Sequence, residues 1–145
     1  MRPTLTIALT LGFAATAALA HVGVKDPQVM ARMHGMKTMG ADLKTLGQMA
    51  RGITAFDEAK ARAALQSLKA ETDQIPALFG PEASDPKSEA LPAIWTDPAG
   101  FQARKEDMAA ALQATRISSP EDIAASMRTI GAACSACHEV YRIKQ

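Results

Sequence analysis

The sequence predicts an all-α domain in which four helices form an antiparallel bundle. Hydrophobic residues recur at helical spacing along four separate stretches, and no stretch shows the alternation of a strand. A helix-capping residue followed by proline opens three of them, at Asp26-Pro27, Asp97-Pro98 and Ser119-Pro120. The composition is rich in the helix-favouring residues Ala, Leu and Met, while aromatic residues make up only 4%. Consecutive helices joined by turns pack as an antiparallel bundle.

Residues 1–20 are typical of a secretory signal peptide. Arg2 gives a positively charged start, most of the rest is apolar, and Ala18-Leu19-Ala20 fits the small-x-small pattern before a cleavage site. Cleavage leaves residues 21–145 as one domain of ordinary length. A retained membrane anchor is the alternative, but the apolar run is short for a bilayer span of about 20 residues. We therefore expect export to the periplasm and no membrane association after cleavage.

The first predicted helix runs from Pro27 to about Arg51, and Gly52 is a natural C-terminal stop. Five of the eight methionines of the chain lie in this helix. Methionines at helical spacing usually serve as adaptable core packing, and most of these five are interpreted in that way. The second predicted helix begins near Thr54, because Thr54 with Asp57 three residues later resembles a capping box.

The second helix is expected to end near Pro76. The segment 80–92 is rich in Pro, Ser, Asp and Glu, which is typical of an exposed loop. The third predicted helix runs from Pro98 to about Thr115. A fourth predicted helix starts at Pro120 and continues almost to the end of the chain.

The most informative motif is Cys134-Ser135-Ala136-Cys137-His138 in the fourth helix. On a helix, the two cysteines and the histidine stand at i, i+3 and i+4, so all three side chains project from one face. Cys-x-x-Cys-His is the attachment signal for a c-type haem. Each thiol adds to one haem vinyl group, and the histidine becomes an axial ligand of the iron.

Other interpretations of this motif explain it less well. A zinc site needs four ligands, and no second ligand pair is visible. A thioredoxin-like redox pair should follow a strand within a βαβ pattern, and no strand pattern precedes this one. A structural disulfide between Cys134 and Cys137 would leave His138 without a role. A coincidental match is disfavoured because these are the only two cysteines in the chain.

A second axial ligand, if the iron has one, must come from upstream. Only seven residues follow His138, and none of them is Met or His. Met127 lies on the same helix as His138 and cannot easily reach the opposite face of the iron. The methionine-rich first helix is therefore the best source of this ligand, with Met108 as the second choice.

Together these features resemble the class II cytochromes c, the family of the cytochromes c′ and their low-spin relatives. The most specific similarity is residues 134–142, which fit the C-terminal pattern Cys-x-x-Cys-His-x-x-aromatic-Arg. Residues 32–37 in the first helix and residues 94–97 before the third add weaker similarity. The resemblance covers nearly all of residues 21–145, and it implies an antiparallel four-helix bundle with one covalently bound haem c.

The resemblance also implies roles for individual residues. Cys134 and Cys137 would hold the haem through two thioethers, and His138 would be the proximal iron ligand. Arg142 would lie beside the proximal pocket, and its alternative is a solvated arginine that favours the helix dipole. Arg32 would sit at the haem edge and pair with a propionate, and its alternative is a surface arginine.

Met36 corresponds to the distal position of the family. In high-spin members an apolar or aromatic residue there leaves the iron five-coordinate, whereas low-spin members have a methionine followed by lysine that binds the iron. Met36-Lys37 is similar to the second kind, and a thioether ligand raises the reduction potential. Met33 and Met39 lie at nearby angles of the helix, whereas His34 points roughly to the opposite side.

The predicted function is periplasmic electron transfer with His138 and Met36 as axial ligands and other redox proteins as transient partners. No acid, base or nucleophile constellation is visible, so an enzyme is not expected. The formal net charge of +1 disappears with Arg2, which argues against a nucleic-acid binder.

Two alternatives remain open. The first is a high-spin cytochrome c′ with an open distal site that binds nitric oxide or carbon monoxide. The second is a haem-free helical binding module with a disulfide between Cys134 and Cys137. Class II cytochromes often form dimers through their first two helices, so a homodimer is compatible with each haem-binding interpretation.

Overall fold

The computed structural model of the chain describes residues 23–144, so the predicted signal peptide at residues 1–20 lies outside the described residues. Within the described part the chain forms helices and no strand. The helices are α1 (Pro27–Ala50), α2 (Glu58–Phe79), α3 (Ala93–Thr96), α4 (Pro98–Gln113) and α5 (Pro120–Tyr141). None of these helices is long and apolar enough to cross a bilayer.

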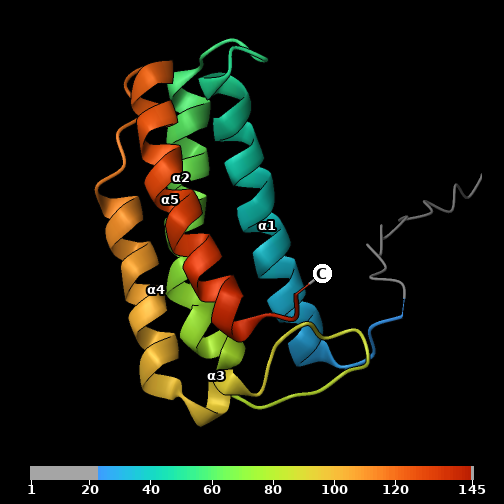
Figure 1. Cartoon of the computed structure of the whole chain (residues 1–145). Helices are drawn as coiled ribbons and strands as arrows, with labels where there is room; N and C mark the ends of the chain where they lie inside the picture. Colours follow the sequence, from blue (N-terminus) through green and yellow to red (C-terminus); the bar gives the residue numbers. More distant parts are fainter. Residues whose placement is uncertain (1–22, 145) are drawn as a thin grey trace, which may run out of the picture.

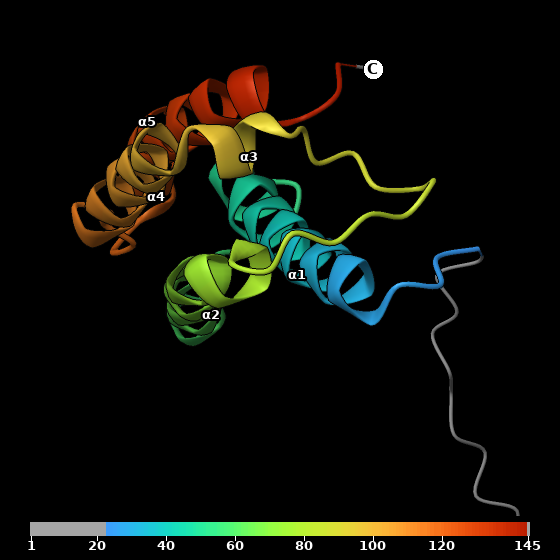
Figure 2. The ribbon, with the colours of Figure 1, turned by 90° about the horizontal axis from the view of Figure 1, so that it is seen from below.

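The four long helices form an antiparallel bundle, which confirms the predicted fold. α1 and α4 run in one direction and α2 and α5 in the other (Figure 1). Seen from below, α1 and α2 form one pair and α4 and α5 a second (Figure 2). The buried core is apolar and draws on all four helices, with further residues from the α4–α5 turn. Its fully buried side chains include Leu46, Met49, Leu68, Leu112, Ile123 and Ile130.

Local capping signals fix where most of the helices begin. The side chains of Asp26, Asp97 and Ser119 each accept a hydrogen bond from a backbone N–H in the first turn of the following helix. In each case the proline at the first helical position follows directly, as predicted. The starts of α1, α4 and α5 are therefore determined by residues adjacent in the sequence.

The second helix begins at the end of the expected stretch of residues 54–57, but the capping box expected at Thr54 does not form. The N-cap of α2 is Asp57, whose Oδ1 accepts a hydrogen bond from the backbone N–H of Lys60 at 3.0 Å. Residues 51–54 instead close the end of α1. Gly52 has φ +67°, and the N–H of Ile53 donates to the carbonyl of Gln48 at 2.9 Å, as in a Schellman motif. The backbone N–H of Thr54 also donates to Gln48, so Thr54 belongs to this turn.

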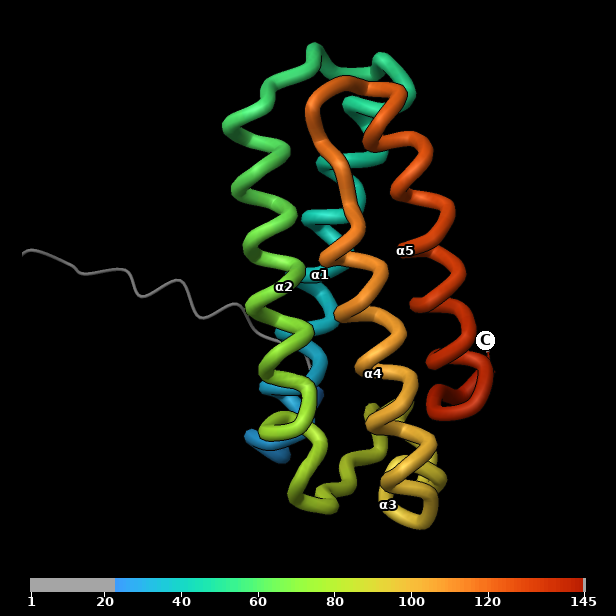
Figure 3. Tube along the Cα trace, turned by 90° about the vertical axis from the view of Figure 1, so that its left-hand side faces the viewer, coloured from blue at the N-terminus to red at the C-terminus, as the bar shows by residue number. Residues whose placement is uncertain are grey.

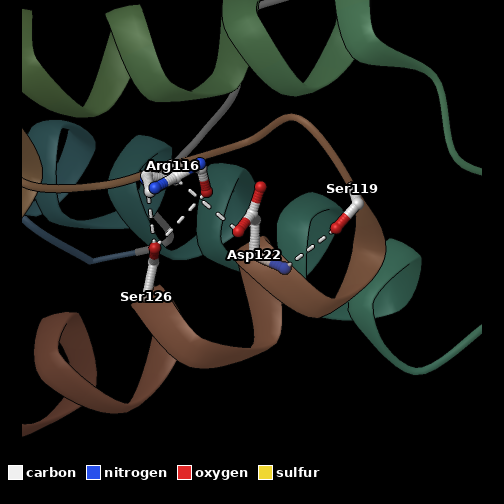
Figure 4. Close-up of polar contacts among 4 residues, drawn as sticks. All are labelled: Arg116, Ser119, Asp122 and Ser126. Carbon is white, nitrogen blue, oxygen red and sulfur yellow. Dashed lines mark hydrogen bonds and ion pairs between the residues drawn. The ribbon is translucent and has the colours of Figure 1, made fainter.

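The turn between α4 and α5 is held by polar contacts that set the register of α5 (Figure 4). Ser126 Oγ accepts from the backbone N–H of Arg116 at 3.1 Å and donates to its carbonyl at 3.3 Å. Arg116 also forms an ion pair with Asp122 at 3.7 Å, next to the Ser119 cap. Since α5 carries the Cys-x-x-Cys-His motif, this turn positions the motif along the bundle.

The short helix α3 was not expected from the sequence. It follows the long loop and is tied to the end of α2, because the indole N–H of Trp95 donates to the carbonyl of Phe79 at 2.8 Å. Its C-terminal residue leads directly into Asp97, the cap of α4. The tube trace shows α3 at the lower end of the bundle, beneath α4 (Figure 3). One helical turn is too short to produce a periodic pattern.

The loop of residues 80–92 is mostly exposed, as predicted, but Asp85 within it is buried. The Asp85 carboxylate accepts hydrogen bonds from the backbone N–H groups of Lys25 at 2.8 Å, Asp26 at 3.2 Å and Lys87 at 2.8 Å. The Lys25 N–H, followed by that of Lys87, lowers the pKa of Asp85. This carboxylate therefore fastens the residues before α1 to the loop.

We expect Asp85→Asn to loosen residues 25–26, because the amide keeps only one acceptor oxygen. Since the folded pKa of Asp85 is lowered, its stabilising contribution is present above the ordinary carboxyl pKa of about 4 and is lost as pH falls through the folded value. The protection of the Lys25 and Asp26 amides against hydrogen exchange, relative to the intrinsic rate at each pH, should therefore fall in the variant and, in the wild type, at acidic pH. Glu82→Gln, an exposed carboxyl in the same loop, should leave the protection of both amides unchanged, and equal effects would contradict this role.

Candidate functional site

A cavity of about 520 Å³ lies between α1, α4 and α5 and the loop segment 87–90. This volume is within the range of roughly 300–1,000 Å³ that is usual for small-molecule and cofactor sites. Apolar side chains from all three helices form most of its wall. They include Val29, Met33, Met36, Met39, Leu43, Phe101, Met108 and Ala133.

The Cys-x-x-Cys-His motif opens onto this cavity. Cys134, Cys137 and His138 all line it from α5, so the one face expected from their helical spacing is the cavity face. Both cysteines are half-buried free thiols, and burial raises the pKa of each. His138 is more exposed than the cysteines. Its pKa is nevertheless lowered, mainly by partial burial and secondly by the positive charge of Arg142. The neutral imidazole is the form that can ligate a metal.

Methionine side chains from α1 face the same cavity. Met33 and Met36 are half-buried, whereas Met39 is buried and belongs to the core. His34 is exposed and does not line the cavity, in agreement with the expectation that it points away. Met108 lines the cavity from α4. The cavity therefore combines an imidazole from one helix with thioethers from another.

Arg32 is buried, with 3% of its surface exposed, so its interpretation as a surface arginine is wrong. Its guanidinium donates to the carbonyls of Leu78 at 2.7 Å, Ala83 at 3.0 Å and Pro81. It also lies over the rings of Phe79 and Trp95, 5.2 and 5.1 Å from their centroids. Burial lowers its pKa. A guanidinium has five N–H groups, so two remain for an anion in the cavity that Arg32 lines.

Arg142 also lines the cavity, one turn after His138. It is half-buried and forms an ion pair with Glu89, with Nη2 and Nε at 2.6 and 2.7 Å from the same carboxylate oxygen. The backbone continues this contact, because Ala90 and Arg142 form an isolated antiparallel bridge. Arg142 thus joins the end of α5 to the loop beside the cavity, and it is not a freely solvated side chain.

Tyr141 is a site residue that the sequence marked only as the aromatic position of the family pattern. It is 5% exposed, and its hydroxyl donates to Asp97 Oδ2 at 2.8 Å. Its ring packs edge-on against Phe101 with centroids 5.1 Å apart. A Cβ at Gly100 would overlap both the Tyr141 hydroxyl and the Asp97 carboxylate. The last turn of α5, which carries His138, is therefore fixed against the first turn of α4.

These residues fit a covalently attached haem. Two thiols and an imidazole lie on one face of α5, thioethers lie on α1, and the remaining wall is largely apolar. The cations on the wall, Arg32 among them, suit the carboxylates that a haem carries. No group of three or more His, Cys, Asp and Glu that would form a separate metal site occurs among residues 23–144.

Comparison with known proteins identifies the family. The sequence model described as Cytochrome C' matches residues 27–142. This chain belongs to the cytochrome c′ family. Cytochrome c-554 of Cereibacter sphaeroides is 38% identical over 99% of both chains, and cytochrome c-556 of Agrobacterium fabrum is 30% identical over 98% of this chain and 96% of its own. The solved R. palustris cytochrome c556 is 30% identical, with a TM-score of 0.75, and the match covers 83% of this chain and 99% of that one.

Family membership confirms the predicted class II cytochrome c, its four-helix bundle and one covalently bound haem c. The alternative of a haem-free helical module is therefore wrong. Members of this family are cytochromes that carry electrons or bind gases, so the chain is a haem protein of an electron-carrier family.

We expect Arg32→Met to destabilise the protein by at least about 2 kcal/mol, because three carbonyls near the end of α2 lose a charged donor. Arg128→Met, which removes an exposed arginine of α5, should change stability by no more than about 0.5 kcal/mol. Urea unfolding of both holoproteins measures the difference. Equal losses in the two variants would show that the Arg32 contacts contribute nothing specific.

Proposed function

We propose that this protein is a periplasmic electron carrier whose haem iron is ligated by His138 and Met36. The observation that carries the proposal is that His138 and Met36 come from different helices and line one cavity together with both cysteines. The haem supplies an iron that changes between the ferric and ferrous states by one electron. The chain contributes the attachment, the ligands and the surroundings that keep both in place.

The attachment is proposed to use Cys134 and Cys137. Each S–H group would add across the double bond of one haem vinyl group, so that the sulfur bonds to one vinyl carbon and the hydrogen to the other. Burial raises the pKa of both thiols, which favours the protonated S–H form. His138 follows the second thiol directly, so attachment would also bring its imidazole close to the iron. Arg32 is proposed to direct its two remaining N–H groups to a haem propionate.

Met36 is the proposed distal ligand among the three methionines on this face of α1. All three line the cavity, but Met39 is buried within the apolar core, whereas Met36 is half-buried and is freer to reach a bound group. Resemblance to the low-spin members, in which lysine follows the ligand methionine, supports the same residue. Ligands held on two packed helices would move little when the iron changes charge, which favours rapid electron transfer.

A second candidate function is the binding of a gas at an open distal site. A solved structure of a variant of cytochrome c prime from Alcaligenes xylosoxidans is a nitric oxide complex, and it is 25% identical to this chain with a TM-score of 0.72. That match covers 81% of this chain and 94% of the other. In this alternative Met36 would pack above the iron without binding it.

The proposed location is the periplasm, because residues 1–20 are typical of an exported protein and c-type haem is attached outside the cytoplasmic membrane in bacteria. The proposed partners are other redox proteins that bind transiently.

We expect the double variant Cys134→Ala/Cys137→Ala to lose covalent attachment, since no other thiol is present in the chain. After denaturing electrophoresis, the wild-type band should retain haem peroxidase staining and the variant band should not. Ser135→Ala changes an exposed residue between the two cysteines and should retain the stain. Persistent staining of the double variant would contradict the assignment.

We expect Met36→Leu to convert a low-spin absorption spectrum to a high-spin one, to bind carbon monoxide readily and to lower the reduction potential, because the thioether ligand is lost. Met33→Leu, a matched change on the same helix face, should keep the low-spin spectrum. Spectra of the ferric and ferrous proteins with and without carbon monoxide measure the difference.

A wild-type protein that is high-spin and binds carbon monoxide would reject Met36 ligation and favour the gas-binding function. A low-spin spectrum unchanged by Met36→Leu would move the assignment to Met33, Met39 or Met108, the other methionines that line the cavity.

A further inference from the structure

Positive charge is concentrated around the haem cavity although the chain as a whole is nearly neutral. Six of the sixteen Lys and Arg residues of the chain line the cavity, but only one of its fifteen Asp and Glu residues does, and all fifteen lie within residues 23–144. The cationic residues are Arg32, Lys37, Lys87, Arg104, Lys105 and Arg142, and the acidic one is Glu89. The two propionates of a haem would not cancel this excess.

The six cations differ in how strongly other groups of the protein hold them. Arg32 is buried, and Arg142 is paired with Glu89. Arg104 and Lys105 form only surface pairs, with Asp107 at 3.2 Å and Asp73 at 3.6 Å, and such pairs hold little energy. Lys37 and Lys87 are exposed and form no ion pair within residues 23–144.

These four less constrained cations come from three separate parts of the fold. Lys37 lies on α1, Lys87 on the loop, and Arg104 and Lys105 on α4, so together they surround the cavity from several sides. Lys37, Lys87 and Arg104 line the cavity and are also exposed. They therefore lie where the cavity meets solvent. We name Lys37, Lys87, Arg104 and Lys105 the basic rim.

Two exposed apolar side chains lie at the C-terminal end of α5 and just beyond it. Val140 and Ile143 are 42% and 47% exposed, and they flank Tyr141 and Arg142, which line the cavity. The N–H of Ile143 donates to the carbonyl of Glu89 at 2.9 Å, so the chain end is held beside the loop that carries Lys87. Figure 2 shows the C-terminal segment and the loop on the same side of the bundle. Apolar contacts surrounded by charge are typical of protein docking surfaces.

We propose that the basic rim, with Val140 and Ile143, is the docking surface for an acidic face of the redox partner. This proposal rests on the electron-transfer function proposed above and adds the chemistry of the partner. Long-range attraction would bring an acidic surface to the side of the protein where the cavity that would hold the haem meets solvent. Because Lys37, Lys87 and Arg104 are exposed and hydrated, the complex would form quickly and dissociate quickly, as a transient carrier requires.

The test measures how the charge around the cavity changes the rate of electron exchange with small charged redox ions. The dithionite-reduced holoprotein is mixed with ferricyanide, an anion, or with tris(phenanthroline)cobalt(III), a cation. In each reaction one electron leaves the protein and reduces one probe ion, to ferrocyanide or to cobalt(II). The variant is Lys37→Glu/Lys87→Glu. Its matched control, Lys44→Glu/Lys60→Glu, makes the same charge change at exposed lysines of α1 and α2 that do not line the cavity.

The variant should react about tenfold more slowly with ferricyanide and faster with the cobalt complex, while the control resembles the wild type. The wild-type rate with ferricyanide should fall as salt is added, and the variant should lose this dependence. Polyglutamate, which stands in for an acidic protein face, should slow the reaction of wild type and control with ferricyanide but not that of the variant.

Two results would overturn the proposal while leaving electron transfer intact. One is an equal change in variant and control, and the other is a shifted reduction potential with unchanged salt dependence, which would assign the lysines to the haem propionates. An unchanged absorption spectrum in the variant verifies that Met36, next to Lys37, is undisturbed. Failure of the wild type to exchange electrons with either probe would instead refute the electron-transfer function itself.

Discussion

The constraint on which the structure depends is the orientation of α5. Its cavity face carries both cysteines and His138, so a rotation of this helix would turn the haem anchors away from the methionines of α1. Three contacts far apart along α5 oppose such a rotation. Ser119 caps its start, Ser126 holds the preceding turn, and Tyr141 binds Asp97 at its end. Ile123 and Ile130 precede the motif on the same face of α5, and they are buried in the core formed with the other three long helices.

The loop beside the cavity is fastened by two buried charges of opposite sign, and both use the backbone. Arg32 donates to carbonyls of residues 78–83, whereas Asp85 accepts from the amide of Lys25 before α1 and from that of Lys87 within the loop. A buried charge is tolerated when its hydrogen bonds are satisfied. Here the partners are backbone N–H and C=O groups that have no backbone partner within the loop itself. The same arrangement explains why an otherwise exposed segment has a defined position next to the cavity.

Most of the fold was predictable because its signals are local. The caps at Asp26, Asp97 and Ser119 act on residues only three positions away, and hydrophobic spacing reports helices directly. The site motif was predictable because chemistry fixes its spacing.

The features that could not be predicted from the sequence depend on contacts between residues that are distant in the chain. Arg32 binds carbonyls 46 to 51 residues away, and the sequence offered only a propionate or solvent as its partner. The Thr54 capping box does not form because the backbone of Thr54 takes part in the turn that ends α1. The helix α3 is too short to produce a periodic hydrophobic pattern.

Gly100 shows how a residue that carries no chemistry can constrain a site on another helix. The space for its missing Cβ is taken by the Tyr141 hydroxyl and the Asp97 carboxylate. A larger residue would have to displace these side-chain ends, and it would weaken one of the contacts that hold the last turn of α5 against α4. The haem-binding helix therefore limits which residues position 100 accommodates for as long as Tyr141 and Asp97 remain paired.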